Sequence, residues 1–269
     1  MMVIVLSVVV ILLVLFLFFI FPSPRRHRDR ELLSGLYIAH RGLHDLREQT
    51  PENSLAAFQS AIDEGYAIEI DIHLTADGQV VVFHDDELQR MCGVSGRVED
   101  KTLAEIKALR LADTEQQVPT LRECLALVDG QVPLLIEFKC RSVGLCNRLC
   151  TAADAILHEY RGAYCIQSFF PFVLWWYRRH RRDVCRGQLA SAFRGEEFHK
   201  RLLGCLIFNV LARPDFVSYD HNYAEHPCRR LCSRLGAYPV GWTFQHQAEL
   251  DRHTEHFDTY IFEGFIPKR

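Results

Sequence analysis

This 269-residue sequence lacks two features: a large positive net charge and a Cys-x-x-Cys pair. The formal net charge is −3, so the chain is not the polycation that nucleic-acid binding favours, and any anionic ligand must be bound by a local basic cluster. The ten cysteines include no Cys-x-x-Cys pair, and a chain with a large core does not need disulfides for stability. We therefore expect no nucleic-acid partner, and free thiols in a reducing compartment.

Charged side chains are also missing from residues 1–21, which are almost entirely Val, Ile, Leu and Phe. A helix of this length, rising about 1.5 Å per residue, crosses a bilayer core of about 30 Å. A cleaved signal peptide is the alternative, but the segment has neither a basic start nor a small-residue cleavage site. We therefore predict an uncleaved transmembrane anchor over residues 1–22.

A basic segment, Pro24 to Arg30, follows the predicted anchor and contains four arginines. Because basic residues are enriched on the cytoplasmic side of membrane spans, this asymmetry predicts a single-pass cell-membrane protein whose C-terminal domain is cytoplasmic. We expect residues 23–34 to be a basic linker. Residues 35–269 are expected to form one domain, since no repeat or low-complexity tract divides them.

Short apolar runs alternate with amphipathic segments along most of the predicted domain. Strands are expected at 36–39, 67–74, 132–139, 163–169, 187–190, 216–219, 238–244 and 260–263. This alternation predicts a parallel α/β architecture, and the number of strands favours a barrel over an open sheet. The run 80–83 is an exception, because only a turn separates it from the run 67–74. Either the two runs form a hairpin, or the barrel lacks one helix here.

The strand predicted at 67–74 carries two acids. Glu69 and Asp71 stand two residues apart, so a strand points both carboxylates to the same side, where a hard cation would bind between them. The second run, Val80 to Phe83, brings His84 to its C-terminal end, where parallel strands of α/β folds usually carry their chemistry. These residues predict an enzyme.

Seven short motifs resemble, in order and spacing, those of the glycerophosphodiester phosphodiesterase family. They are His40-Arg41-Gly42, Pro51-Glu52-Asn53-Ser54, Glu69-Ile70-Asp71, His84-Asp85, Glu137-Phe138-Lys139, Gln167-Ser168-Phe169 and Trp242-Thr243. The resemblance runs from about residue 36 to 245 and implies a TIM (β/α)8 barrel within the superfamily of phospholipase-C-like phosphodiesterases. Two positions depart from the family pattern: Gln245 stands where Asn is usual, and Glu263 lies where the closing strand usually ends in Thr-Asp or Thr-Asn.

The resemblance and the chemistry of the residues imply the same catalytic group. Glu69, Asp71 and Glu137 would bind one divalent cation, Ca²⁺ or Mg²⁺, both of which take oxygen ligands. Phosphodiester cleavage needs a base for the attacking hydroxyl and an acid for the leaving oxygen. His40 and His84 would share these roles, because histidine titrates near neutral pH.

Four further residues are expected around this group. Arg41 and Lys139 would bind the phosphate. Glu52 would hold a metal ligand or His40, or would favour the start of a helix. Trp242 would form an apolar wall for the alcohol part of the substrate, or would belong to the core.

The resemblance implies hydrolysis of glycerophosphodiesters to sn-glycerol 3-phosphate and an alcohol, through attack by the glycerol 2-hydroxyl and a cyclic phosphate. A membrane lysophospholipid is an alternative substrate, because the anchor would hold the domain next to a bilayer. A catalytically degenerate, membrane-tethered binding module is the alternative from another class. The arginine-rich segment Tyr177 to Arg182 either touches anionic head groups or is a solvated basic face, and we favour the latter.

Overall fold

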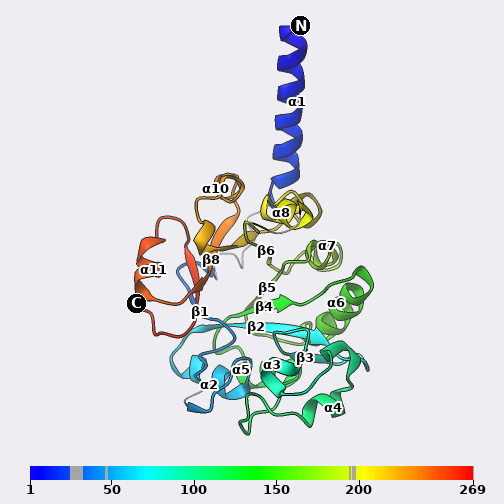
Figure 1. Cartoon of the computed structure of the whole chain (residues 1–269), viewed down its shortest axis with the longest axis vertical. Helices are drawn as coiled ribbons and strands as arrows, with labels where there is room; N and C mark the ends of the chain where they lie inside the picture. Colours follow the sequence, from blue (N-terminus) through cyan, green and yellow to red (C-terminus); the bar gives the residue numbers. More distant parts are fainter. Residues whose placement is uncertain (25–32, 46–47, 194, 196–197, 269) are drawn as a thin grey trace.

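Eight parallel strands form a closed barrel in the C-terminal domain (Figure 1). The structure is a computed structural model that describes residues 1–24, 33–45, 48–193, 195 and 198–268. The barrel strands are β1 (Tyr37–Ala39), β2 (Ala67–Leu74), β4 (Leu134–Phe138), β5 (Tyr164–Ser168), β6 (Arg186–Ala190), β7 (Phe216–Asp220), β8 (Tyr238–Phe244) and β9 (Thr259–Phe262). Their spatial order is β1-β9-β8-β7-β6-β5-β4-β2, and pairing of β1 with β2 closes the ring. The predicted TIM (β/α)8 barrel is confirmed.

Helices in the connections between strands surround the barrel. They are α2 (Leu55–Asp63), α5 (Leu121–Val128), α6 (Val143–Leu157), α7 (Pro171–His180), α8 (Phe198–Gly204), α9 (Asn209–Ala212), α10 (Pro227–Arg234) and α11 (Gln247–Arg252). Side chains at their N-termini cap α2 and α5: the Ser54 hydroxyl accepts the N–H of Ala57 at α2, and Thr120 caps α5, where Glu123 completes a capping box. The apolar stripe of α2 buries Phe58 completely.

The run 80–83 forms a hairpin with β2, which decides between the two alternatives that the sequence left open. Strand β3 (Val80–Val82) pairs antiparallel with the end of β2, outside the ring of eight. The turn between them is too short for a crossover. Because β3 runs back along β2, the N–H of Phe83 donates to the carbonyl of Asp71 at 2.9 Å, which returns His84 to the level of the acids. The excursion that follows contains α3 (Gln89–Cys92), the 3-10 turn Val98–Asp100 and α4 (Leu103–Lys107).

The barrel interior changes from apolar to polar along the strands. Near the N-terminal ends of the strands, a cluster that includes Ala67, Leu135 and Phe216 is buried. One pleat further along β2 and β4, the inward positions are Glu69 and Glu137. Polar chemistry is thereby concentrated at the C-terminal ends of the strands, the end at which barrel enzymes hold their active sites. All ten cysteines are free thiols, as expected.

The N-terminal helix α1 (Met2–Ile20) projects away from the barrel (Figure 1). Its apolar side chains are largely exposed, and it is long and apolar enough to cross a membrane, a test that a signal sequence also passes. Its last residue, Ile20, is buried against α9, where the amide of Asn209 donates to the Ile20 carbonyl at 3.0 Å. The arginines of the basic flank, Arg25 to Arg30, lie outside the described residues, so the predicted orientation stays a prediction.

Candidate active site

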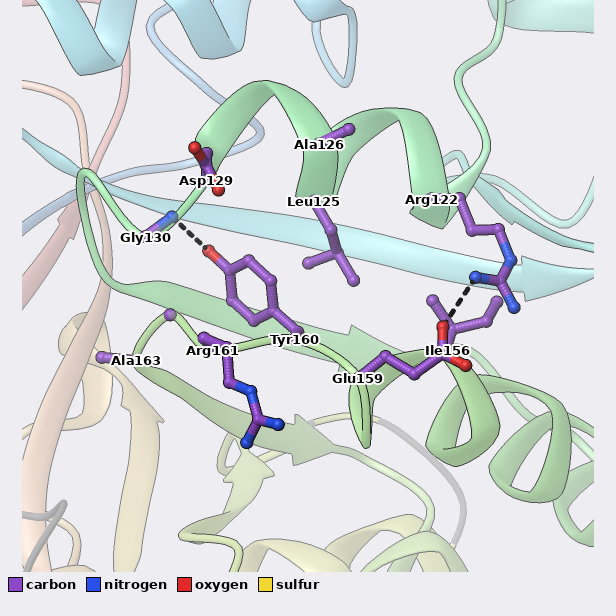
Figure 2. A pocket seen from close by; sticks show the side chains of 11 residues that line it. Arg122, Leu125, Ala126, Asp129, Gly130, Ile156, Glu159, Tyr160, Arg161 and Ala163 are labelled. Carbon is purple, nitrogen blue, oxygen red and sulfur yellow. Dashed lines mark hydrogen bonds and ion pairs between the residues drawn. The ribbon is translucent and has the colours of Figure 1, made fainter.

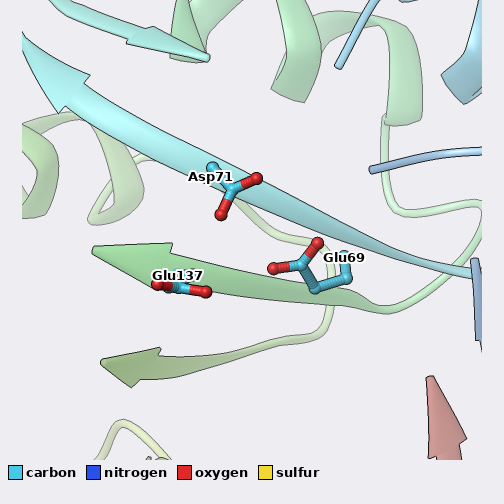
Figure 3. A group of neighbouring side chains, drawn as sticks. All are labelled: Glu69, Asp71 and Glu137. Atoms are coloured by element: carbon cyan, nitrogen blue, oxygen red, sulfur yellow. The ribbon is translucent and has the colours of Figure 1, made fainter. Parts of the chain in front are cut away.

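Three carboxylates meet inside the mouth of the barrel (Figure 3). Glu69 and Asp71 come from β2 and Glu137 from β4, and the register of the two strands sets Asp71 beside Glu137. Ligand oxygens of the three residues lie within 4.8 Å of one another, and all three residues are buried. Three acids are thus held together where water screens their charges poorly.

The titration of these acids shows how strongly they repel one another. Burial, together with Asp71 and Glu137, raises the pKa of Glu69 well above its ordinary value. Burial also raises the pKa of Glu137 to about 7, although Lys139 acts in the opposite direction. Burial alone would raise the pKa of Asp71 too, but Lys139 and other nearby cations lower it below its ordinary value. The cluster therefore has more negative charge than its own cations compensate.

This donor set fits one hard divalent cation. Ca²⁺ and Mg²⁺ both take carboxylate oxygens, and such an ion would relieve the repulsion that raises two of the three pKa values. The acids are also oriented by hydrogen bonds: the Asn53 side chain donates to Asp71 Oδ2 at 3.0 Å, and the backbone N–H of Arg41 donates to Glu69 Oε2 at 3.2 Å.

Two cationic side chains border the acids. The Lys139 ammonium lies 2.9 Å from Asp71 Oδ1 and 2.6 Å from Glu137 Oε1. Burial would lower the pKa of Lys139, but these two carboxylates raise it, so the ammonium keeps its proton. The guanidinium of Arg41 lies beside the same cluster, with Nε 3.5 Å from Asp71 Oδ2. Both cations are therefore within reach of an anion that approaches the acids.

The structure places Glu52 on Arg41, in place of the metal ligand or His40 that the sequence suggested. Arg41 Nη1 donates to Glu52 Oε1 at 2.8 Å, and Arg90 donates to both oxygens of Glu52 at 2.7 and 2.8 Å. At the start of α2 the cap itself is Ser54. Glu52 instead fixes the position of the Arg41 guanidinium.

His84 is held through its Nδ1 atom. That atom lies 2.6 Å from Asp85 Oδ1, and Arg90 donates to Asp85 Oδ2 at 2.6 Å. Burial, followed by the charge of Lys139, lowers the pKa of His84 to about 4, so the imidazole is neutral at pH 7 and can accept a proton. His73, the other histidine of this region, contacts the backbone carbonyl of His84 through Nε2 at 3.1 Å and supports the loop.

His40 is held in the same manner by a residue from the far end of the chain. Its Nδ1 lies 2.6 Å from Glu263 Oε2, and the amide of Gln245 donates to Glu263 Oε1 at 2.9 Å. The hydrogen bond with His40 lowers the pKa of Glu263 to about 2, so this carboxylate is charged. With Nδ1 engaged, Nε2 is the nitrogen left for a substrate. The two residues that depart from the family pattern thus stand behind His40.

A cavity of about 190 Å³ gathers these groups. The residues that line it are His40, Arg41, Glu69, His84, Glu137, Lys139, Gln167, Phe169, Leu189, Trp242, Thr243 and Ile261. Asp71 is not among these lining residues, but its carboxylate contacts Lys139. Trp242 is partly exposed at the wall, where its ring meets Phe169 edge-on at 5.8 Å between centroids, and it also packs on the apolar layer below. Every candidate residue named from the sequence lies in the cavity or one contact from it.

Sequence reasoning assigned no role to several residues that the structure brings to this site. Asn53, Asp85 and Gln167 belong to the motifs quoted above, and their motif positions were the available signal. Glu263 could be noted only as a departure from the family pattern. Arg90 has no such signal, because its contacts with Asp85 and Glu52 depend on how the excursion after β3 folds.

A larger hollow, of about 590 Å³, lies on the outside of the barrel between α5 and α6 (Figure 2). Two of its charged groups pair with each other: Arg122 Nη1 lies 3.2 Å from Glu159 Oε2 (Figure 2). The Tyr160 hydroxyl accepts the N–H of Gly130 at 3.1 Å. Size alone therefore does not identify the functional site; the convergence of acids, histidines and cations does.

Comparison with known proteins agrees with this site. The profile of the "Glycerophosphoryl diester phosphodiesterase family" matches residues 40–162. Glycerophosphodiester phosphodiesterase 1 of Bos taurus is 31% identical over 272 residues, which cover 85% of this chain and 78% of that protein. The glycerophosphodiester phosphodiesterase of Caldanaerobacter subterraneus is 38% identical over 114 residues, or 40% of this chain and 45% of that protein.

Solved structures share the barrel. The Oleispira antarctica phosphodiesterase, solved in complex with the product sn-glycerol-3-phosphate, has a TM-score of 0.71 at 23% identity and covers 87% of this chain and 94% of its own. The glycerophosphodiester phosphodiesterase of Thermotoga maritima has a TM-score of 0.64 at 24% identity, with 84% and 93% covered. At this identity the likeness establishes the fold.

The extent of the sequence matches differs between relatives. With relatives from Bacillus subtilis, Caldanaerobacter subterraneus and Homo sapiens, the match spans 44–46% of their length, which is less than half. The match to the bovine protein spans more than two thirds of it. On that match, together with the family profile, the chain belongs to the glycerophosphodiester phosphodiesterase family.

Proposed function

We propose that this chain is a phosphoric diester hydrolase that cleaves glycerophosphodiesters to sn-glycerol 3-phosphate and an alcohol, with one divalent cation, Ca²⁺ or Mg²⁺. The observation that carries the proposal is one cavity that joins three buried acids, two histidines each paired with a carboxylate, and two cations. The Oleispira relative, solved with sn-glycerol-3-phosphate, supports the same class of substrate.

Arg41 and Lys139 bind the phosphate in this proposal. The planar guanidinium, fixed by Glu52, suits two phosphate oxygens, and the ammonium supplies a point charge. The divalent cation, bound by the three acids, would neutralise charge on a phosphodiester oxygen. Trp242 and Phe169 provide an apolar wall for the alcohol part of the substrate.

Proton transfer is shared between the histidines. His84, neutral at pH 7, accepts the proton of the attacking glycerol 2-hydroxyl as its oxygen bonds to phosphorus. His40 donates a proton to the alcohol oxygen as its bond to phosphorus breaks, which leaves a cyclic phosphate. Water then opens the ring with the two roles reversed. Asp85 and Glu263 hold each imidazole through Nδ1, so that Nε2 is available for transfer.

A soluble glycerophosphodiester fits the position of α1 better than a membrane lysophospholipid. Ser23, just after α1, donates its N–H to the carbonyl of Pro214, which precedes β7 at the N-terminal end of the barrel. The catalytic residues follow the C-terminal ends of the strands. If α1 spans the membrane, as we propose, with the barrel on the cytoplasmic side, the bilayer lies near the end of the barrel opposite the cavity.

Release of glycerol 3-phosphate tests the proposal. We would incubate the full chain, in a neutral detergent, with glycerophosphocholine, glycerophosphoethanolamine or lysophosphatidylcholine, and with Ca²⁺, Mg²⁺ or a chelator. His40→Asn should abolish turnover. The control variant His158→Asn changes an exposed histidine at the C-terminal end of α6 and should leave turnover intact. Turnover of the lysophospholipid alone would move the substrate to the membrane. If none of the three substrates is hydrolysed and the metal still binds, the result would favour the alternative of a catalytically degenerate, membrane-tethered binding module.

A further inference from the structure

Another concave site lies next to the end of α1, away from the proposed catalytic cavity. Its volume is about 200 Å³, and the residues that line it are Ser23, Pro24, Arg178, Arg182, Arg186, Arg213 and Asp215. Four of these seven residues are arginines, and they come from three separate parts of the chain: α7 with the turn after it, β6 and the loop after α9. The tertiary fold therefore assembles a positive site that no single segment contains.

Backbone carbonyls hold three of the arginines in place. Arg178 Nη1 donates to the carbonyls of Val210 and Leu211, both at 2.9 Å. Arg186 is buried, with Nε donating to the Ala212 carbonyl at 3.1 Å. These acceptors carry no formal charge, so the hydrogen bonds orient the guanidinium groups without neutralising them. The one carboxylate of the lining, that of Asp215, lies 3.7 Å from Arg186.

The arginines also repel one another. Burial, then the nearby charge of Arg182, lowers the pKa of Arg178, and burial, then Arg178, lowers that of Arg213. A guanidinium remains protonated under these conditions, so the site keeps its positive charge. Planar guanidinium groups held close together match the oxygens of a phosphate.

The site lies at the level where α1 ends. Arg213 Nη1 donates to the carbonyls of Phe18 and Phe21 at 2.9 and 2.7 Å, and its guanidinium lies 4.8 Å from the centre of the Phe18 ring. Arg213 thus caps the last turn of α1, whose base meets the domain beside α8 (Figure 1). If α1 spans the bilayer, this turn is at the depth of the lipid head groups, which carry phosphate.

We propose that this arginine pocket binds the phosphate of an anionic lipid head group in the leaflet next to the barrel. The inference rests on the proposed span of α1 but not on the proposed hydrolysis. It replaces the expectation of a purely solvated basic face for the segment Tyr177 to Arg182, because two arginines of that segment, Arg178 and Arg182, line the pocket. Binding here would fix the rotation of the barrel on its anchor.

Lipid titration of the full chain tests this inference. The chain, in a neutral detergent with a chelator present, is titrated with short-chain phosphatidylglycerol, short-chain phosphatidylcholine or inorganic phosphate, and binding is followed by microscale thermophoresis. We expect tighter binding of phosphatidylglycerol than of phosphatidylcholine or phosphate. The double variant Arg178→Gln/Arg182→Gln should bind phosphatidylglycerol about tenfold or more weakly.

A matched control removes the same charge elsewhere. The double variant Arg179→Gln/Arg230→Gln changes one arginine of α7 and one of α10 outside the pocket lining, and it should bind like the unchanged chain. Because Arg178 holds two carbonyls, the single change Arg182→Gln, at an exposed residue, provides a variant that keeps those bonds; it should still weaken binding.

Three results would overturn the inference: equal binding by the pocket variants and the unchanged chain, equal loss in the control variant, or binding of inorganic phosphate or phosphatidylcholine as tight as that of phosphatidylglycerol. Glycerol 3-phosphate release is measured in parallel with metal added. Normal turnover in the pocket variants with lost lipid binding separates this site from the catalytic cavity. Intact lipid binding in a chain without turnover would contradict only the proposed hydrolysis.

Discussion

Metal binding by the three acids should depend steeply on pH, because the ion must displace protons. Without metal, the pKa of Glu137 is raised to about 7, so its carboxyl is mostly protonated at pH 6 and mostly ionised at pH 8. Competition by this single proton lowers the apparent affinity about tenfold from pH 8 to pH 6. Glu69, whose pKa is also raised, adds to the effect in the same direction. The affinity should therefore rise with pH and level off above the pKa of these groups.

Calorimetric titration with CaCl₂ or MgCl₂ measures this linkage. The experiment is run at pH 6, 7 and 8 in buffers with different enthalpies of ionisation, which also counts the protons released on binding. We expect close to one proton or more at pH 6 and far less at pH 8. Glu137→Gln should bind more weakly at every pH and release fewer protons. Equal affinity at pH 6 and pH 8, with no proton release, would refute the reasoning.

Three further changes have defined outcomes. Glu263→Gln removes the charge behind His40 and should lower kcat about 10- to 100-fold, since a hydrogen bond to a charged group contributes about 1.5–3 kcal/mol. KM and metal affinity should stay nearly constant, and an unchanged kcat would show that Glu263 does not orient His40. Gly42→Ala should destabilise the chain by about 1–3 kcal/mol in urea unfolding, because φ is +83° and a Cβ would lie 2.9 Å from Ala57; an unchanged midpoint would contradict this. Phe58→Ala, in a fully buried position, should cost about 3–5 kcal/mol in the same assay, and a loss below about 1 kcal/mol would mean that the site repacks.

The parts of the site that could be predicted from the sequence depend on local periodicity. Glu69 and Asp71 share a face because a strand repeats every two residues, and this holds whichever strand lies beside them. Glu137 and Lys139 are related in the same way on β4. The alternation of strands and helices likewise predicted the barrel, because each connection is long enough for a helix.

The hairpin between β2 and β3 could not be predicted from local sequence patterns. A short turn and an apolar run were both visible in the sequence, but they are compatible with a hairpin and with a barrel strand that lacks its helix. Pairing of Leu74 with Val80 decides for the hairpin, and it returns His84 to the acids by an antiparallel path. The position of His84 beside the acids was predicted, whereas the path of the chain to it was left open between two alternatives.

The sequence by itself determined the fold class, the apolar N-terminal helix and the residue types of the candidate active site, because these depend on patterns within a few residues. Only the tertiary structure decided which groups support them. Glu263 lies 223 residues from His40 along the chain, and it reaches that imidazole because β9 pairs with β1 to close the barrel. The arginine pocket is likewise formed by α7 with the turn after it, β6 and the loop after α9. Contacts of this range depend on closure of the sheet and on the packing of helices around it, and no local pattern encodes either one.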